Sequence, residues 1–328
     1  MLLAYIIRRI LWAIPFLFVV TLIAFALIQA PPGDYITTFA ATLSASGDQI
    51  DQERLVALRE RYGLDQPFIV QYWRWISGVL VGDFGISFEW QQPVSNLIWE
   101  RMALSVTLAL STLLFTWAVA FPIGIYSAVK KYSIGDYIVT GVGFIGLAMP
   151  SFLVALVLMY FAVTVFGADV TGLFSPEYEK APWSWAKVGN LFAHLWIPVL
   201  ILGLSSTASL TRIMRANLLD ELHKPYVTTA RAKGLSEFRL LIKYPVRLAL
   251  NPFISTLGWA FPQLISGAVI TAFVLSLPTS GPLLLQALLA QDMYLAGAFI
   301  LLLCCLSIVG MLVSDILLAL VDPRIKYR

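Results

Sequence analysis

The sequence predicts an all-α integral membrane protein with about six transmembrane helices. Hydrophobic residues make up 59% of its 328 residues and charged residues only 12%, whereas soluble domains contain roughly 45–50% and about 25%. Apolar runs of about 18 residues or more recur along the chain, and each is long enough to cross a hydrocarbon core of about 30 Å. A soluble chain of this length would not need so many.

The apolar runs expected to cross the membrane are about 10–30, 103–128, 137–166, 195–216, 250–274 and 297–321. The first follows Arg8 and Arg9, but its length of about 20 residues exceeds the roughly 7–15 of a signal-peptide core, so we expect a retained span. The inner four contain Pro122, Pro150, Pro198 and Pro262. Proline kinks a spanning helix and is tolerated where neighbouring groups satisfy the freed carbonyls.

The orientation follows from the distribution of Lys and Arg. With both termini placed in the cytoplasm, fifteen of the 22 basic residues fall on cytoplasmic segments, eight of them between Arg212 and Arg247. Positively charged loops favour the cytoplasmic side. We therefore expect a multi-pass protein of a bacterial inner membrane with cytoplasmic N- and C-termini.

Three regions are expected along the chain. Residues 1–30 form the N-terminal tail and first span, residues 31–102 an extracytoplasmic subdomain, and residues 103–328 a core that contains a basic cytoplasmic segment at 220–245. In the extracytoplasmic subdomain, Asp51–Tyr62 has amphipathic helical spacing, and Pro67 suits the first turn of a second helix to Val81. Its aromatic residues are expected to form an interfacial belt or a small core.

The basic cytoplasmic segment predicts two short helices joined at a glycine. Pro225 suits a helix start, the helix is expected to end near Lys233, and Gly234 suits a helix C-cap. A second helix is expected over Ser236–Tyr244, with Leu240 and Leu241 as its apolar face. By spacing alone, a basic loop that merely follows the positive-inside rule explains this segment equally well.

Several motifs together resemble one family. The stretch Tyr226-Val-Thr-Thr-Ala-Arg-Ala-Lys-Gly-Leu-Ser-Glu237 resembles the coupling signature of binding-protein-dependent ABC importer permeases of the dipeptide/oligopeptide type. Further matches occur in the same order along nearly the whole chain: Ile7–Ile10, Ala30–Asp34, Tyr62–Pro67, Gly82–Ser87, Ala148–Phe152 and Asp322–Ile325. Any one of these motifs is weak alone, but as a set they are specific.

The resemblance implies a permease subunit that forms half of a translocation path. Its expected partners are a second homologous permease, two ATP-binding subunits, an extracytoplasmic solute-binding protein and membrane lipid, with no nucleic acid. ATP and magnesium belong to the ATP-binding subunits; no cofactor, metal or catalytic residue is expected in this chain, which contains no G-x-x-x-x-G-K-[ST] motif. The residues expected to couple to the ATP-binding subunits are Tyr226, Thr228, Thr229, Ala230, Arg231, Ala232, Lys233 and Gly234.

Two departures from the family pattern concern coupling and cargo. Thr228 stands where the coupling signature classically begins with an acid, which peptide-type members also often lack. At the outer end of the fifth span, Ala272 and Pro282 replace the acidic residue and the arginine that are common in peptide-type relatives. The cargo is therefore expected to be di- or oligopeptides or related small solutes, with oligosaccharides as the alternative.

The expected substrate path is uncharged. Its candidates are Ser151, Gln263, Ser266 and Thr271, with Ser205, Ser206, Thr207 and Ser209 of the fourth span. Each of these hydroxyl or amide groups serves a helix–helix hydrogen bond more often than a cargo contact. Asp315 is the acidic residue deep in a span and is expected to pair with a hydroxyl of a neighbouring span or with a partner subunit.

Two other classes of protein compete with this interpretation. A secondary transporter driven by an ion gradient would show an internal repeat and mid-membrane acids, whereas this sequence shows no convincing repeat and almost no such acids. A membrane enzyme would need clustered nucleophiles, metal ligands or acid–base pairs, whereas the only histidines are His194 and His223.

Overall fold

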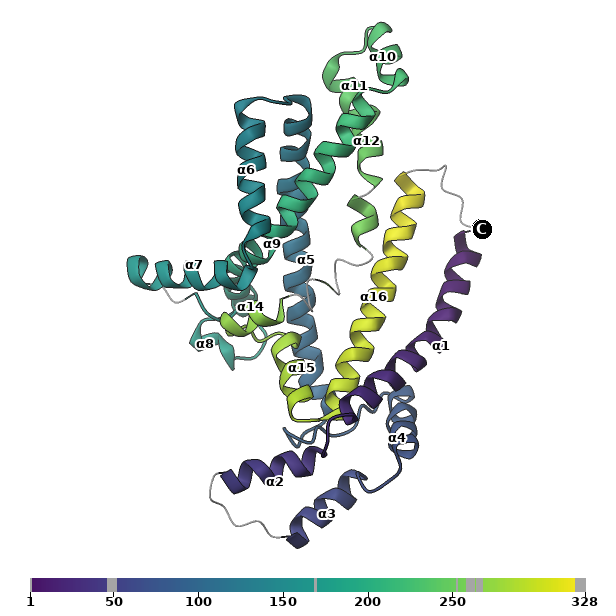
Figure 1. The fold of residues 1–328 in the computed structure, drawn as a ribbon, viewed down its shortest axis with the longest axis vertical. Helices are drawn as coiled ribbons and strands as arrows, with labels where there is room; N and C mark the ends of the chain where they lie inside the picture. Colours follow the sequence, from purple (N-terminus) through teal and green to yellow (C-terminus); the bar gives the residue numbers. More distant parts are fainter. Residues whose placement is uncertain are drawn as a thin grey trace. The chain divides into compact units, whose positions relative to one another are not determined.

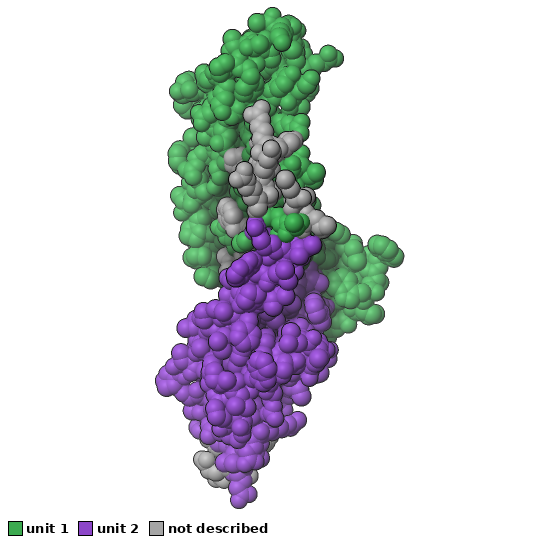
Figure 2. Space-filling view, turned by 90° about the vertical axis from the view of Figure 1, so that its right-hand side faces the viewer, with its two compact units in different colours: residues 1–5, 106–278, 307–328 green, residues 6–105, 279–306 purple. Residues whose placement is uncertain are grey.

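The computed structural model describes residues 2–45, 52–167, 170–251, 253–257, 263 and 268–321. Within these ranges every named element is a helix, and extended pairing is limited to an isolated bridge between Ile86 and Pro93. The chain forms two compact units (Figure 2). Unit 1 contains residues 1–5, 106–278 and 307–328, and unit 2 contains residues 6–105 and 279–306.

Among the described residues, four helices are long and apolar enough to cross a membrane (Figure 1). They are α1 (Leu2–Gln29), α5 (Val94–Val129), α9 (Trp185–Leu222) and α16 (Met293–Val321). They confirm the first, second, fourth and sixth expected spans. The fifth, 250–274, lies partly outside the described residues and ends in the short helix α14 (Val269–Val274), so the total of six remains a prediction.

The third expected span, 137–166, is not one continuous helix. It consists of α6 (Ile134–Ala148) and α7 (Ser151–Phe166), which bend by 100° at Met149 and Pro150. Met149 and Pro150 both have extended backbone angles, because proline disfavours the helical conformation in the residue that precedes it and lacks the N–H that would continue the ladder. The sequence interpretation anticipated a kink here and not a break.

Unit 1 is held together around α9. The helix α12 (Pro245–Ala249) and Phe253 pack with buried residues of α5 and α9: Ala120, Ala128, Leu210, Met214 and Leu218. A methyl group at Gly124 would lie 2.6 Å from Cβ of Met214, so only glycine permits this approach of α5 to α9. Unit 1 also contains the short helix α8 (Pro176–Glu179).

A buried ion pair ties the start of α6 to α9. Arg215 donates two hydrogen bonds of 2.8 Å to the carboxylate of Asp136, whose side chain is 3% exposed. Ser127 of α5 also donates to Asp136, and Ser133 caps the N-terminus of α6. Since a buried carboxylate must be paired to be tolerated, this contact fixes three helices to one another.

Unit 2 has an aromatic core. Its helices include α2 (Tyr35–Ala45), α3 (Gln52–Tyr62), α4 (Phe68–Leu80) and α15 (Ser280–Leu289). The core contains Phe25, Tyr35, Tyr62, Trp75 and Phe88 among other buried residues. The predicted helices 51–62 and 67–81 are confirmed as α3 and α4, and their aromatic residues supply much of this core.

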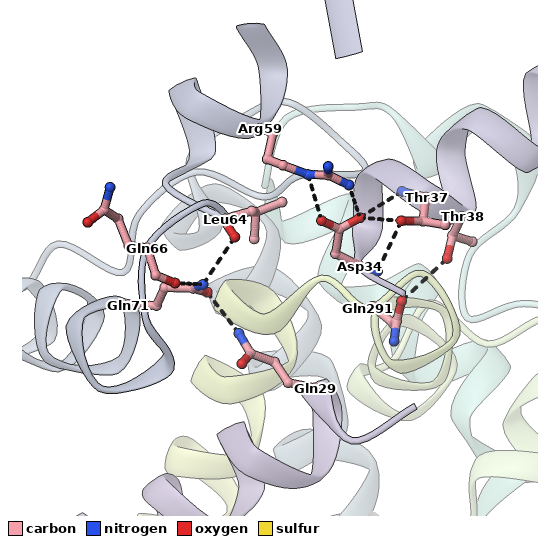
Figure 3. A network of polar contacts seen from close by, with 9 residues as sticks. All are labelled: Gln29, Asp34, Thr37, Thr38, Arg59, Leu64, Gln66, Gln71 and Gln291. Carbon is pink, nitrogen blue, oxygen red and sulfur yellow. Dashed lines mark hydrogen bonds and ion pairs between the residues drawn. The ribbon is translucent and has the colours of Figure 1, made fainter. Parts of the chain in front are cut away.

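Two polar networks fix the loops of unit 2. In the first, Arg59 of α3 donates two hydrogen bonds, of 3.0 and 3.1 Å, to Asp34, which also accepts from Thr37 (Figure 3). Burial opposes ionisation of Asp34, but the hydrogen bonds from Thr37 and Arg59 outweigh it and hold the pKa of this carboxyl below its usual value. Beside it, Gln29 donates to Gln71 at 2.8 Å.

In the second network, the carboxylate of Asp292 is fully buried. It accepts hydrogen bonds from the Ser87 hydroxyl and from the backbone N–H groups of Phe88, Glu89 and Leu295. Burial raises the pKa of Asp292 in spite of these bonds. The loop that follows Gly85 is thereby fixed to the first turn of α16.

Candidate functional site

The basic segment at 220–245 folds into two short helices beyond the end of α9 (Figure 1). Helix α10 spans Pro225–Ala232 and α11 spans Glu237–Lys243, close to the predicted bounds. Pro225 occupies the first turn of α10, and Gly234 has a φ of 77°. A left-handed residue of this kind ends a helix and favours glycine, so the predicted helix–glycine–helix element is confirmed.

The two helices form one small unit with its own apolar centre. Val227 and Ala230 of α10 are buried against Leu240 of α11. Across the turn at Gly234, Arg231 donates two hydrogen bonds, of 2.5 and 3.0 Å, to Glu237. Each partner favours the charged form of the other, so the pKa of Glu237 is lowered and that of Arg231 is raised. The α10–α11 pair therefore has fixed internal geometry.

The α10–α11 pair is also tied to the membrane helices at both ends. At the first end, Glu221 of α9 accepts hydrogen bonds from the Tyr226 hydroxyl at 2.6 Å and from Lys224 at 2.7 Å. Burial and this carboxylate raise the pKa of Tyr226. At the other end, α12 follows directly and packs on α9 through Val246 and Ala249. A force on α10 therefore reaches α9 and the chain after α12 together.

The residues expected to couple divide by exposure. Six of them are exposed: Thr228, Thr229, Arg231, Ala232, Lys233 and Gly234. Tyr226 is half-buried, and Ala230 is 8% exposed and faces α11. A surface available to a partner is thus formed by the exposed six, whereas Tyr226 and Ala230 hold the element together. The role of this surface in coupling is taken up below as a proposal.

Sequence reasoning missed the apolar part of this surface. Phe238 is 76% exposed and Ile242 is 46% exposed, one helical turn apart on α11. Their spacing of four residues, next to the buried Leu240, was a signal that α11 has apolar residues on two faces. Isolated exposed apolar residues are common, but here they extend the exposed surface of α10.

A cavity of about 380 Å³ in unit 1 is lined by hydroxyl groups. The residues that border it include Ser205, Ser206 and Ser209 of α9 and Thr116 of α5. The hydroxyl of Thr116 is buried and makes no hydrogen bond. The described residues that line this cavity carry no charge, which agrees with the uncharged path expected from the sequence.

The four predicted path residues do not all reach this cavity. Ser151 and Gln263 line it. Thr271 is 1% exposed, does not line it, and shares a hydrogen bond of 2.9 Å with the Ser151 hydroxyl. Thr271 thus positions Ser151 and does not itself face the cavity, while Ser266 lies outside the described residues.

Asp315, the acidic residue deep in a span, accepts a hydrogen bond of 2.8 Å from the hydroxyl of Tyr5 on α1. The expected pairing with a hydroxyl of a neighbouring span is therefore confirmed.

Comparison with known proteins gives a consistent result over the whole length. Residues 120–327 match the family model described as binding-protein-dependent transport system inner membrane component, and residues 2–110 match the model for the N-terminal part of such membrane components. The chain is 36% identical to the oligopeptide transport system permease protein AppB of Bacillus subtilis and 31% identical to the dipeptide transport system permease protein DppB of Escherichia coli. Each alignment covers 99% of both chains.

Proposed function

Since the chain belongs to the family of binding-protein-dependent transport system inner membrane components, we propose that it is one of two permease subunits of an ATP-driven importer. It is a multi-pass membrane protein, and its cytoplasmic face is the one that presents α10 and α11. A second permease would complete the path, two ATP-binding subunits would supply energy, and a solute-binding protein would deliver cargo to the outer face.

The α10–α11 pair is the observation that carries this proposal. It is exposed, internally fixed by Arg231 and Glu237, and tied to α9 through Glu221. These are the properties needed to convert movement of a docked subunit into movement of membrane helices, because a flexible loop would absorb the displacement instead. Closure of the two ATP-binding subunits on ATP would move α10, and α9 would move with it.

The proposed cargo is di- or oligopeptides. The two relatives above are named for oligopeptide and dipeptide transport, and these names do not favour oligosaccharides. The uncharged cavity agrees with recognition of peptides through backbone amides, because serine hydroxyls and the Gln263 amide can both donate and accept. Isolation of the cognate binding protein and titration with peptides and with oligosaccharides tests this directly: binding of oligosaccharides alone would reject a peptide cargo.

The coupling role is tested by a substitution on the exposed face of α10. Ala232→Arg adds bulk and charge where the structure places no neighbour to clash, unlike Ala230, which is buried against α11. In the assembled importer we expect this substitution to reduce cargo-stimulated ATP hydrolysis by about tenfold, the effect of losing roughly 1.4 kcal/mol of interface energy. Ala41→Arg on the exposed face of α2 is the matched control and should leave hydrolysis unchanged. Equal activity of the two variants would reject coupling through α10.

A further inference from the structure

A second cavity, of about 370 Å³, lies between α5, α6 and α9. We call it the α6–α9 groove. Its apolar lining includes Ile138, Val142 and Phe144 of α6 with Leu204 and Ala208 of α9. Val142 and Phe144 are 56% and 61% exposed. The groove is distinct from the hydroxyl-lined cavity, with which it shares only Leu147 among the described lining residues.

The groove changes from apolar to basic along its length. Leu147 and Leu204 border one end, whereas Ser127, Arg212 and Arg215 border the end where α5 stops and α6 starts. From Leu204 to Arg215 the helix rises about 16 Å, which is about half of a hydrocarbon core of roughly 30 Å. The groove therefore extends over the depth of one membrane leaflet, and the orientation proposed above places its basic end at the cytoplasmic surface.

The basic end retains positive charge. Asp136 is the acidic residue at this end, and it is already bonded by Arg215. Arg212 is exposed and has no hydrogen bond or ion pair to any described residue. The exposed Lys130 and Lys131 follow Ser127 closely in the chain. A negatively charged group placed here would meet Arg212 without displacing an existing partner.

An unpaired hydroxyl lies deeper in the same groove. The oxygen of Thr207 is buried and makes no hydrogen bond, and Thr207 lines the groove. It lies five residues before Arg212, or about 7.5 Å farther along the helix axis. Phospholipids carry ester carbonyls just below the headgroup phosphate, and a carbonyl at this depth could accept a hydrogen bond from Thr207.

We propose that the α6–α9 groove binds a phospholipid with an anionic headgroup from the cytoplasmic leaflet. Arg212 contacts the phosphate, Thr207 contacts an ester carbonyl, and the acyl chain occupies the apolar part between Ile138 and Leu204. Basic pockets between membrane helices on the cytoplasmic side are suited to anionic headgroups. The proposal depends on the orientation of the chain and not on its cargo.

The experiment uses the assembled importer, stripped of lipid, and then supplied with either phosphatidylglycerol or phosphatidylcholine. Native mass spectrometry measures the lipid that remains bound. Gly143→Leu fills the groove, since a Cβ there would meet only Ala208 at 3.9 Å. Gly141→Leu is its control on the same helix: a Cβ at Gly141 meets nothing within 4 Å, and this residue does not line the groove. Arg212→Gln removes the charge without adding bulk.

We expect wild type and Gly141→Leu to retain phosphatidylglycerol in preference to phosphatidylcholine. Arg212→Gln should retain about fivefold less, the factor expected for one basic residue near an anionic surface. Gly143→Leu should also retain less phosphatidylglycerol than Gly141→Leu, because its side chain fills the groove. Retention at the wild-type level by either of these two variants, or equal retention of the two lipids, would overturn the proposal. Crosslinking of a photo-reactive side chain at Val142 to the second permease, and not to lipid, would also overturn the proposal. If these variants still transport peptide, the proposed importer function stands, whichever lipid result is obtained.

Discussion

At the scale of single residues, Gly234 and the ion pair beside it determine the shape of the proposed coupling surface. Gly234 has a φ of 77°, and a side chain at this position would meet no other atom within 4 Å. Substitution there is therefore strained by its backbone conformation alone, at a cost of roughly 1–2 kcal/mol. Since the site is exposed, the added side chain also projects from the surface that we propose to dock.

Gly234→Asp is expected to abolish transport-coupled ATP hydrolysis while the importer still assembles in the membrane. Gly82→Asp provides the control, because Gly82 also has a positive φ, of 87°, and open space around it, but lies in unit 2. The measurement is cargo-stimulated ATPase activity in reconstituted vesicles. Normal stimulation in the Gly234→Asp importer would contradict a role for this turn in coupling.

Arg231 and Glu237 give a second prediction at this scale. Both side chains are exposed, and they bond to each other across the Gly234 turn. If their pairing fixes the α10–α11 geometry, Arg231→Glu should lower coupling, and the exchange Arg231→Glu with Glu237→Arg should restore most of it. Stimulated ATP hydrolysis of the single and double variants measures this. A double variant no better than the single one would show that Arg231 acts on a partner and not on Glu237.

At the scale of elements, α9 joins the two cavities of unit 1 to the α10–α11 pair. It borders both cavities, accepts the α10–α11 pair at Glu221 and is bonded to α6 through Arg215. Because packed and bonded neighbours constrain α9 along its length, we expect it to transmit a displacement at Glu221 toward the cavities. The carboxylate of the Asp136–Arg215 pair is almost fully buried, so removing its cationic partner would leave an uncompensated buried charge.

Arg215→Gln is expected to destabilise the importer by about 3 kcal/mol, because it leaves the buried Asp136 without its cationic partner. Arg212→Gln, one turn earlier on the same helix, removes an exposed arginine that pairs with no described residue, so the melting temperature should change little. Thermal unfolding of the purified complexes, with tryptophan fluorescence as the readout, compares the two. Equal melting temperatures would mean that the Asp136–Arg215 pair does not stabilise unit 1.

The local elements were predictable where one residue type determines the backbone. Pro225 and Gly234 fixed the bounds of α10 to within a residue, and Pro67 fixed the start of α4. Tertiary contacts between distant segments were not predictable. Nothing in the local pattern shows that Asp292 accepts from Ser87, or that Thr271 turns toward Ser151 and away from the cavity. The 100° bend also exceeded the kink that Pro150 suggested, since a proline fixes its own φ but not the packing of the helix that follows.

At the scale of the whole molecule, the role we propose for the chain is that of a transmitting subunit. Its sequence contains no phosphate-binding loop of the G-x-x-x-x-G-K-[ST] type, and the exposed α10–α11 pair offers a partner a firm attachment to α9. The hydroxyl-lined cavity and the α10–α11 pair both belong to unit 1. Energy would therefore enter through α10 and act on a path bordered by the same helix.

The most direct test is uptake of labelled peptide into vesicles that contain this chain, its second permease and both ATP-binding subunits, with the binding protein outside and ATP inside. The account predicts accumulation against a gradient, and loss of accumulation when the ATP-binding subunits are omitted or when Ala232→Arg is introduced. Uphill accumulation by vesicles that contain this chain alone would contradict the account.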